Sequence, residues 1–194
     1  MDAKNIALCS LFVAVAIVLG RFSVNIGAGI SFYFWEIPVV VALLLYGFKM
    51  GFSVAAISIF GQAIFFPKAI GIFFPIWNLI AMTTTIVGIA LTLWLITRKI
   101  SNGSKTGKTG VKLLILLVSS AIGVRLAIMP FVNFFMYKYM LAFVIGKVYS
   151  DVYVMALIPF LMVYDAVLVF YSVTIGYIIA KRANRDLKIG NTFL

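Results

Sequence analysis

Long apolar blocks without polar alternation constrain this chain more than any other feature. Six of them occur, at about 5–20, 36–48, 51–66, 75–97, 111–137 and 152–180. Inside a bilayer every backbone group must be paired, so only helices and closed barrels span it. Barrel strands alternate apolar and polar residues over about ten positions, which these blocks do not. The blocks therefore predict transmembrane helices. A composition of 64% hydrophobic and 11% charged residues also indicates an integral membrane protein.

The segments between the blocks predict one all-α transmembrane domain over residues 1–194. The one clearly hydrophilic loop is 98–112, which is rich in Ser, Gly, Thr and Lys. The blocks at 36–48 and 51–66 are shorter than the roughly 20 residues that cross a bilayer core of about 30 Å. Whether these two helices span the membrane fully is left open by the sequence.

The distribution of Lys and Arg predicts the orientation of the bundle. Six spans place both termini on one side, together with loop 98–112, and eleven of the 16 basic residues fall on that side. These are Lys4, Lys49, Arg98, Lys99, Lys105, Lys108, Lys112, Lys181, Arg182, Arg185 and Lys188. Cytoplasmic loops collect basic residues, so both termini are predicted to be cytoplasmic. Orientation and anionic lipid then account for the net charge of +11 without nucleic acid.

Several kinds of chemistry are disfavoured by residues that are rare or missing. The chain has no His, one Cys and five acidic residues that do not occur in pairs. Histidine-ligated metals, His-based catalysis and an internal disulfide are therefore not expected. The glycines at 103, 107 and 110 form no phosphate-binding loop, so the chain is not expected to hydrolyse ATP. We expect no metal, no cofactor and no enzymatic activity.

A stripe of small residues runs along the first predicted helix. Ala3, Ala7, Ser10 and Ala14 recur at steps of four, three and four, which places them on one helical face. Small side chains let helix backbones approach closely in lipid, where no hydrophobic force drives association. The stripe predicts either tight packing within this bundle, which we favour, or a docking face for another membrane protein.

Aromatic and polar residues gather on the side opposite the termini. Four consecutive aromatic residues, 32–35, precede Glu36, and Trp77 and Tyr164 lie toward the same side. An interfacial aromatic belt explains some of these residues. Flat rings with a few polar groups also suit a pocket for a small flat molecule. The pattern therefore predicts a ring-lined binding cup on the outer side.

Two charges fall within predicted helices, where an ionisable group is costly and usually functional. Arg125 lies about 13 residues into the fifth helix and Asp165 about 13 residues into the sixth, from opposite ends. A rise of 1.5 Å per residue places both near the midplane. They are predicted either to form a buried ion pair that holds the two helices or to face a ligand cavity.

Four features make the chain similar to the substrate-binding S components of energy-coupling factor (ECF) vitamin transporters. They are the size with six helices, the small face of Ala7, Ser10 and Ala14, the segments 30–38 and 46–51, and the Ile-Pro-Phe of 158–160. The last motif is similar to riboflavin-type members, although Leu161 and Tyr164 stand where those members usually have Asn and Lys. Segments 19–22 and 30–38 resemble folate-type members equally.

The resemblance implies a transport role in a prokaryotic cell membrane. Such a subunit binds its vitamin from outside, with the linker before the second helix acting as a lid. It then docks through the small face of the first helix on a transmembrane T component joined to two ATPase subunits. Riboflavin is our first expectation for the substrate, and folate, thiamine and pantothenate are alternatives.

On this interpretation, ten residues form the substrate site. Phe32, Phe34, Trp35, Trp77 and Tyr164 enclose a heteroaromatic ring, and Glu36, Asn78, Arg125, Asn133 and Asp165 supply orienting hydrogen bonds. Two other classes are considered. The first is a structural or assembly membrane protein without a ligand, in which Arg125 and Asp165 lock the fold. The second, a membrane enzyme, is disfavoured by the missing His and paired carboxylates.

Overall fold

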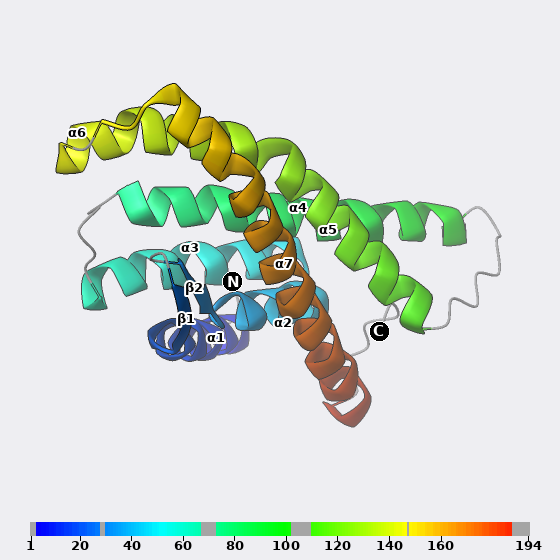
Figure 1. Ribbon diagram of the computed structural model, residues 1–194. Coiled ribbons are helices and arrows are strands. Elements are labelled where there is room, and N and C mark those ends of the chain that lie inside the picture. The colour runs from blue at the N-terminus through cyan, green and yellow to red at the C-terminus, as the bar shows by residue number, and fades with distance from the viewer. Residues whose placement is uncertain (1–2, 28–29, 67–72, 102–109, 147, 188–194) are drawn as a thin grey trace.

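The computed structural model describes residues 3–27, 30–66, 73–101, 110–146 and 148–187 as a bundle of six principal helices (Figure 1). They are α1 (Ala3–Arg21), α2 (Glu36–Tyr46), α3 (Phe48–Phe65), α4 (Phe73–Ser101), α5 (Gly110–Phe135) and α7 (Asp151–Leu187). A π-helical turn η1 (Met136–Met140) continues α5 into the short α6 (Leu141–Ile145). The predicted all-α six-helix architecture is confirmed.

Five of these helical segments are long and apolar enough to cross a membrane: Ala3–Arg21, Phe48–Phe65, Phe73–Arg98, Gly110–Val144 and Asp151–Asp186. The third predicted helix is therefore long enough to span. The second is not, because α2 has 11 residues and a length of about 16 Å. The chain is built as a multi-pass membrane protein whose second helix covers only part of the bilayer thickness.

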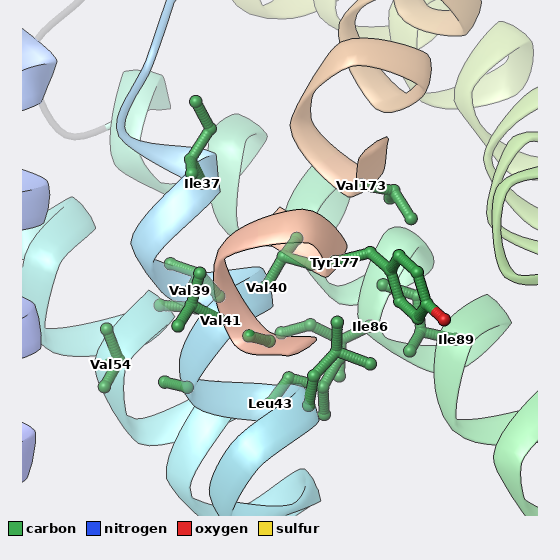
Figure 2. Close-up of a cluster of buried hydrophobic side chains, with 14 of the residues drawn as sticks. Ile37, Val39, Val40, Val41, Leu43, Val54, Ile86, Ile89, Val173 and Tyr177 are labelled. Atoms are coloured by element: carbon green, nitrogen blue, oxygen red, sulfur yellow. The ribbon is translucent and has the colours of Figure 1, made fainter. Parts of the chain in front are cut away.

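The short α2 forms the centre of the bundle. Every residue from Glu36 to Leu45 is buried, because α1, α3 and α7 pack around this helix. Figure 2 shows side chains of α2, among them Val40 and Leu43, together with Val173 and Tyr177 of α7 and Ile86 of α4. A helix that is apolar on all sides belongs in such a position. Because α2 is short and central, its first residue, Glu36, begins inside the bundle.

A close backbone approach joins α4 to α5. A Cβ atom placed on Gly88 of α4 would lie 2.5 Å from the Cα atom of Ala121 in α5. Ser120 Oγ donates a hydrogen bond of 2.8 Å to the Gly88 carbonyl at the same crossing. Only a residue without a side chain permits this contact, which is the usual way that helices associate tightly in lipid.

The break between α2 and α3 is a single residue. Gly47 has a φ of 87°, which suits glycine, and its N–H bonds the Leu43 carbonyl at 2.9 Å. The sequence predicted that the second helix ends near residue 48 and that the third begins near residue 51, but α3 already begins at Phe48. The turn reverses the chain so that α3 packs against α2.

A β-hairpin occupies much of the linker between α1 and α2. Strand β1 (Ser23–Gly27) pairs antiparallel with β2 (Ile30–Tyr33), with Val24 opposite Phe32. The sequence indicated only a linker here. The Tyr171 hydroxyl of α7 donates a 2.5 Å hydrogen bond to the carbonyl of Tyr33, so the hairpin is tied to α7 immediately before α2 begins.

Candidate functional site

A buried ion cluster joins four helices inside the bundle. It consists of Arg125 from α5, Asp165 from α7, Glu36 from the start of α2 and Thr85 from α4. Arg125 Nε donates to Asp165 Oδ1 at 2.8 Å, and Nη2 lies 2.8 Å from the same oxygen. Nη1 donates to Glu36 Oε1 and to Thr85 Oγ1, each at 3.2 Å. The predicted possibility of an Arg125–Asp165 ion pair is therefore realised.

The ion cluster holds two carboxylates and one guanidinium. Glu36, Arg125 and Asp165 are exposed by only 2%, 3% and 4%, so water contributes little to their stabilisation. Glu36 lies in the first turn of α2, where the positive end of the helix dipole favours a carboxylate. The cluster therefore has one acidic side chain more than it has basic ones, inside a largely apolar bundle.

Aromatic rings of the hairpin lie beside the ion cluster. The Phe32 ring lies 5.2 Å from that of Tyr164 and 5.8 Å from that of Tyr171, while Phe34 meets Tyr171 edge-on at 5.9 Å. Tyr164 directly precedes Asp165 and lies within electrostatic reach of the other ionised groups of the cluster. Trp35, between the hairpin and Glu36, is buried. Six predicted site residues thus lie in the ion cluster or in the adjoining hairpin and α7 region: Phe32, Phe34, Trp35, Glu36, Tyr164 and Asp165.

A second polar group, here called the tyrosine cluster, lies farther along α4 and α5. Its members are Trp77, Asn133, Tyr137, Tyr149 and Tyr153. Trp77 Nε1 donates a 2.9 Å hydrogen bond to the buried Asn133 Oδ1, and the Tyr137 ring packs edge-on against Trp77 at 5.5 Å. Trp77 lies eight residues before Thr85 on α4, and Asn133 lies eight residues after Arg125 on α5. Eight residues correspond to about 12 Å along a helix.

Asn78 belongs to neither group by its hydrogen bonds. Its side-chain amide donates to the Phe74 carbonyl of its own helix at 2.9 Å.

Two members of the site were not predicted from the sequence. Tyr171 lies seven residues after Tyr164, so helical periodicity could have placed it on the same face. Thr85 lies within a run of three threonines that gave no signal to separate it from its neighbours.

In the region of the predicted cup, side chains of the chain itself contact one another. Phe32 covers Tyr164, and Arg125 is bonded within the chain. The described residues outline a groove elsewhere, between the start of α5 and the end of α7, with a volume of about 700 Å³. In the described ranges, no three His, Cys, Asp or Glu side chains converge on a possible metal site.

The small residues of α1 face outward. Ala3, Ala7, Ser10 and Ala14 are all exposed, whereas the buried face of α1 carries Cys9, Val13 and Ala16. The favoured prediction that the stripe packs within this bundle is therefore wrong. Packing of α1 against α3 uses Gly20 and Gly61 instead, which meet Gln62 and Ile17. The alternative, a docking face for another membrane protein, stays a prediction.

Comparison with solved structures shows a likeness in fold. A solved structure of the S component of a bacterial ECF transporter superposes with a TM-score of 0.69, over 97% of this chain and 99% of that one. The two sequences are 18% identical, so the likeness shows a common fold. No family model and no curated protein matches the sequence.

Proposed function

We propose that this chain is the substrate-binding S component of an ECF-type vitamin importer, embedded in a prokaryotic cell membrane. The observation that carries the proposal is a buried ion cluster at the start of α2, covered by aromatic side chains of the hairpin, within a fold shared along its whole length with an S component. Apolar sites with a few placed polar groups suit small heteroaromatic ligands.

The ligand site extends, in this proposal, from the ion cluster to the tyrosine cluster. The two clusters are separated by about 12 Å along α4 and α5, a span that suits one vitamin-sized molecule. Tyr164 and Trp77 would stack on its rings, while Glu36, Asp165 and Asn133 would bind its polar groups. Entry requires the hairpin to leave its position over Tyr164, and the Tyr171–Tyr33 hydrogen bond is the contact that this movement breaks.

The acidic excess of the ion cluster bears on substrate choice. Folate and pantothenate carry carboxylates, which a site with two acidic side chains and one guanidinium disfavours. Riboflavin is neutral and thiamine is cationic, so both are compatible with the charge. Riboflavin stays our first candidate, with thiamine next, and folate and pantothenate follow.

The decisive experiment is to identify the ligand directly. The protein is purified in detergent and denatured, and any released small molecule is identified by mass spectrometry. Binding of riboflavin, thiamine, folate and pantothenate is then measured by calorimetry. We expect one of them to bind, and Tyr164→Leu to weaken its binding by at least about fivefold, because base–ring stacking contributes about 1–3 kcal/mol. Tyr139→Leu is the matched control, since Tyr139 is exposed and packs on Phe135 away from both clusters.

A protein without a ligand is the second candidate, and the complete pairing of Arg125 within the chain favours it. The exchange Arg125→Asp with Asp165→Arg separates the two, because it preserves the number of charges beside Glu36. In a purely structural cluster, the double variant is more stable than either single variant. In a ligand site, all three variants lose binding. Empty spectra with no binding across the panel, together with rescue by the exchange, would leave the structural role.

We further propose that the exposed stripe of α1 docks on a transmembrane T component that works with two ATPase subunits. Ala14→Trp is then expected to abolish uptake by the assembled transporter but to leave folding and ligand affinity unchanged. Val15→Trp is the matched control, because Val15 is also exposed but lies about 100° around the helix. Equal loss of uptake in both variants would contradict a docking role for the stripe.

A further inference from the structure

A basic groove lies between the beginning of α5 and the end of α7, far along α7 from the ion cluster. Figure 1 shows these two helix ends at its lower right. Its cationic lining residues are Lys181, Arg182 and Arg185, and its apolar lining residues are Val111, Leu114 and Ile178. The volume of about 700 Å³ falls within the range of small-molecule sites. Neither the substrate site nor the stripe on α1 includes any of these residues.

The floor of the groove is fixed by a hydrogen bond between the two helices. Tyr177 is buried, and its hydroxyl donates to the carbonyl of Gly110 at 3.0 Å. A Cβ atom on Gly110 would lie 2.6 Å from Lys181 Nζ, so the absence of a side chain at Gly110 leaves room for the ammonium group. The first turn of α5 therefore lies beside a cation of α7.

The charge of the groove is not neutralised within the described chain. Arg182 and Arg185 both approach Asp186, at 3.8 and 3.3 Å, and one carboxylate cannot balance them together with Lys181. The arginine side chains are 79% and 78% exposed, so they are accessible from outside. A ligand with an anionic group would complete this arrangement.

The apolar lining defines what else the ligand contains. Val111 and Ile178 are 67% and 57% exposed, on helices long and apolar enough to cross the membrane. Their exposed surfaces are therefore expected to meet lipid chains rather than water. The groove thus combines cations at the membrane boundary with an apolar surface directed into the bilayer, which are the two features of a phospholipid-binding pocket.

We propose that this groove binds an anionic phospholipid of the leaflet that the distribution of Lys and Arg predicts to be cytoplasmic. Its phosphodiester is held by Lys181, Arg182 and Arg185, and its acyl chains lie along Val111, Leu114 and Ile178. The occupant joins the beginning of α5 to the end of α7. It is expected to stabilise the folded protein by mass action.

The test is lipid binding to the full chain in detergent, measured by native mass spectrometry. The probes are 1-palmitoyl-2-oleoyl-phosphatidylglycerol, the corresponding phosphatidylcholine and inorganic phosphate. We expect phosphatidylglycerol to bind at least about tenfold more tightly than phosphatidylcholine, because each basic residue near the headgroup contributes about a fivefold factor. The double variant Lys181→Gln/Arg182→Gln is expected to lose this preference. Gly110→Leu, which fills the groove without changing charge, is expected to weaken phosphatidylglycerol binding as well.

The matched control is Lys49→Gln/Arg98→Gln, which removes the same charge from exposed positions outside the groove. It should retain the preference for phosphatidylglycerol. Three results would each overturn the proposal. The first is an equal loss of the phosphatidylglycerol preference in the control, which assigns the effect to overall charge, and the second is an unchanged preference in Lys181→Gln/Arg182→Gln. The third is displacement of the lipid by inorganic phosphate at similar concentration, which assigns the groove to a free anion.

Discussion

The arrangement of the ion cluster predicts that its three charged residues contribute unequally to the stability of the protein. Arg125 is the sole described cation that bonds two buried carboxylates, those of Glu36 and Asp165. Arg125→Met keeps a similar length of side chain but leaves both carboxylates buried without a partner. Glu36→Gln instead removes the charge that exceeds the single guanidinium. The two variants test whether the cluster is organised around Arg125.

The magnitudes follow from the bonds that each change removes. Breaking a buried ion pair by deleting one partner costs about 3–5 kcal/mol, so Arg125→Met should cost at least that much. In Glu36→Gln the amide oxygen still accepts a hydrogen bond from Arg125 Nη1. The remaining ion pair of Arg125 and Asp165 has no net charge. Ser172 Oγ is buried beside this position without a well-formed hydrogen bond, so it offers an acceptor for the new amide N–H. We expect Glu36→Gln to change stability by less than about 1.5 kcal/mol.

The free energy of unfolding is measured by titrating the protein from detergent micelles into sodium dodecyl sulfate. Arg98→Met serves as the control for loss of an arginine, because Arg98 is exposed and, among the described residues, contacts only the ring of Trp94. It should change stability by less than about 1 kcal/mol. The reasoning fails if Glu36→Gln is as destabilising as Arg125→Met, or if Arg125→Met behaves like the exposed control.

Two further predictions concern packing and hydrogen bonding. Gly88→Ala should destabilise the protein by about 1–3 kcal/mol, since its methyl group would meet the α5 backbone at 2.5 Å. The control is Gly123→Ala, where a methyl group would enter open space. This variant should be neutral or stabilising by up to about 1 kcal/mol in the same titration. Trp77→Phe should cost about 1–3 kcal/mol because it leaves the buried Asn133 oxygen without its donor. Asn78→Ala should cost less, as its amide bonds only its own helix, and equal melting temperatures for the two variants would contradict this.

The helices of this protein could be predicted well from sequence, because long apolar blocks have few alternatives in a bilayer. The hairpin could not, although β2 contains the alternating Ile30–Tyr33 segment, because four residues carry too little periodic signal. The aromatic run that follows dominated the interpretation of this linker. Two strands also need a neighbour for stability, and the contact with Tyr171 of α7 becomes visible only in three dimensions.

The candidate site was partly predictable because depth in the membrane can be counted along a helix. Counting from both ends of the bundle put Arg125 and Asp165 near the midplane, and the structure pairs them at 2.8 Å. The participation of Glu36 was not predictable in this way. It depends on α2 being short and central, so that a residue 89 positions from Arg125 in sequence begins a helix inside the bundle.

The wrong prediction for the α1 stripe has a general physical cause. In water, an apolar or small residue on a helix face is usually covered, because exposure costs free energy in proportion to area. In lipid that cost vanishes, so Ala7 and Ala14 are equally stable facing the bilayer or a neighbouring helix. A charged residue such as Arg125 still pays a large desolvation penalty in lipid and must point inward to its partners. Sequence alone therefore locates the polar residues of a membrane bundle better than its small ones, and the direction of a small-residue stripe has to come from the structure.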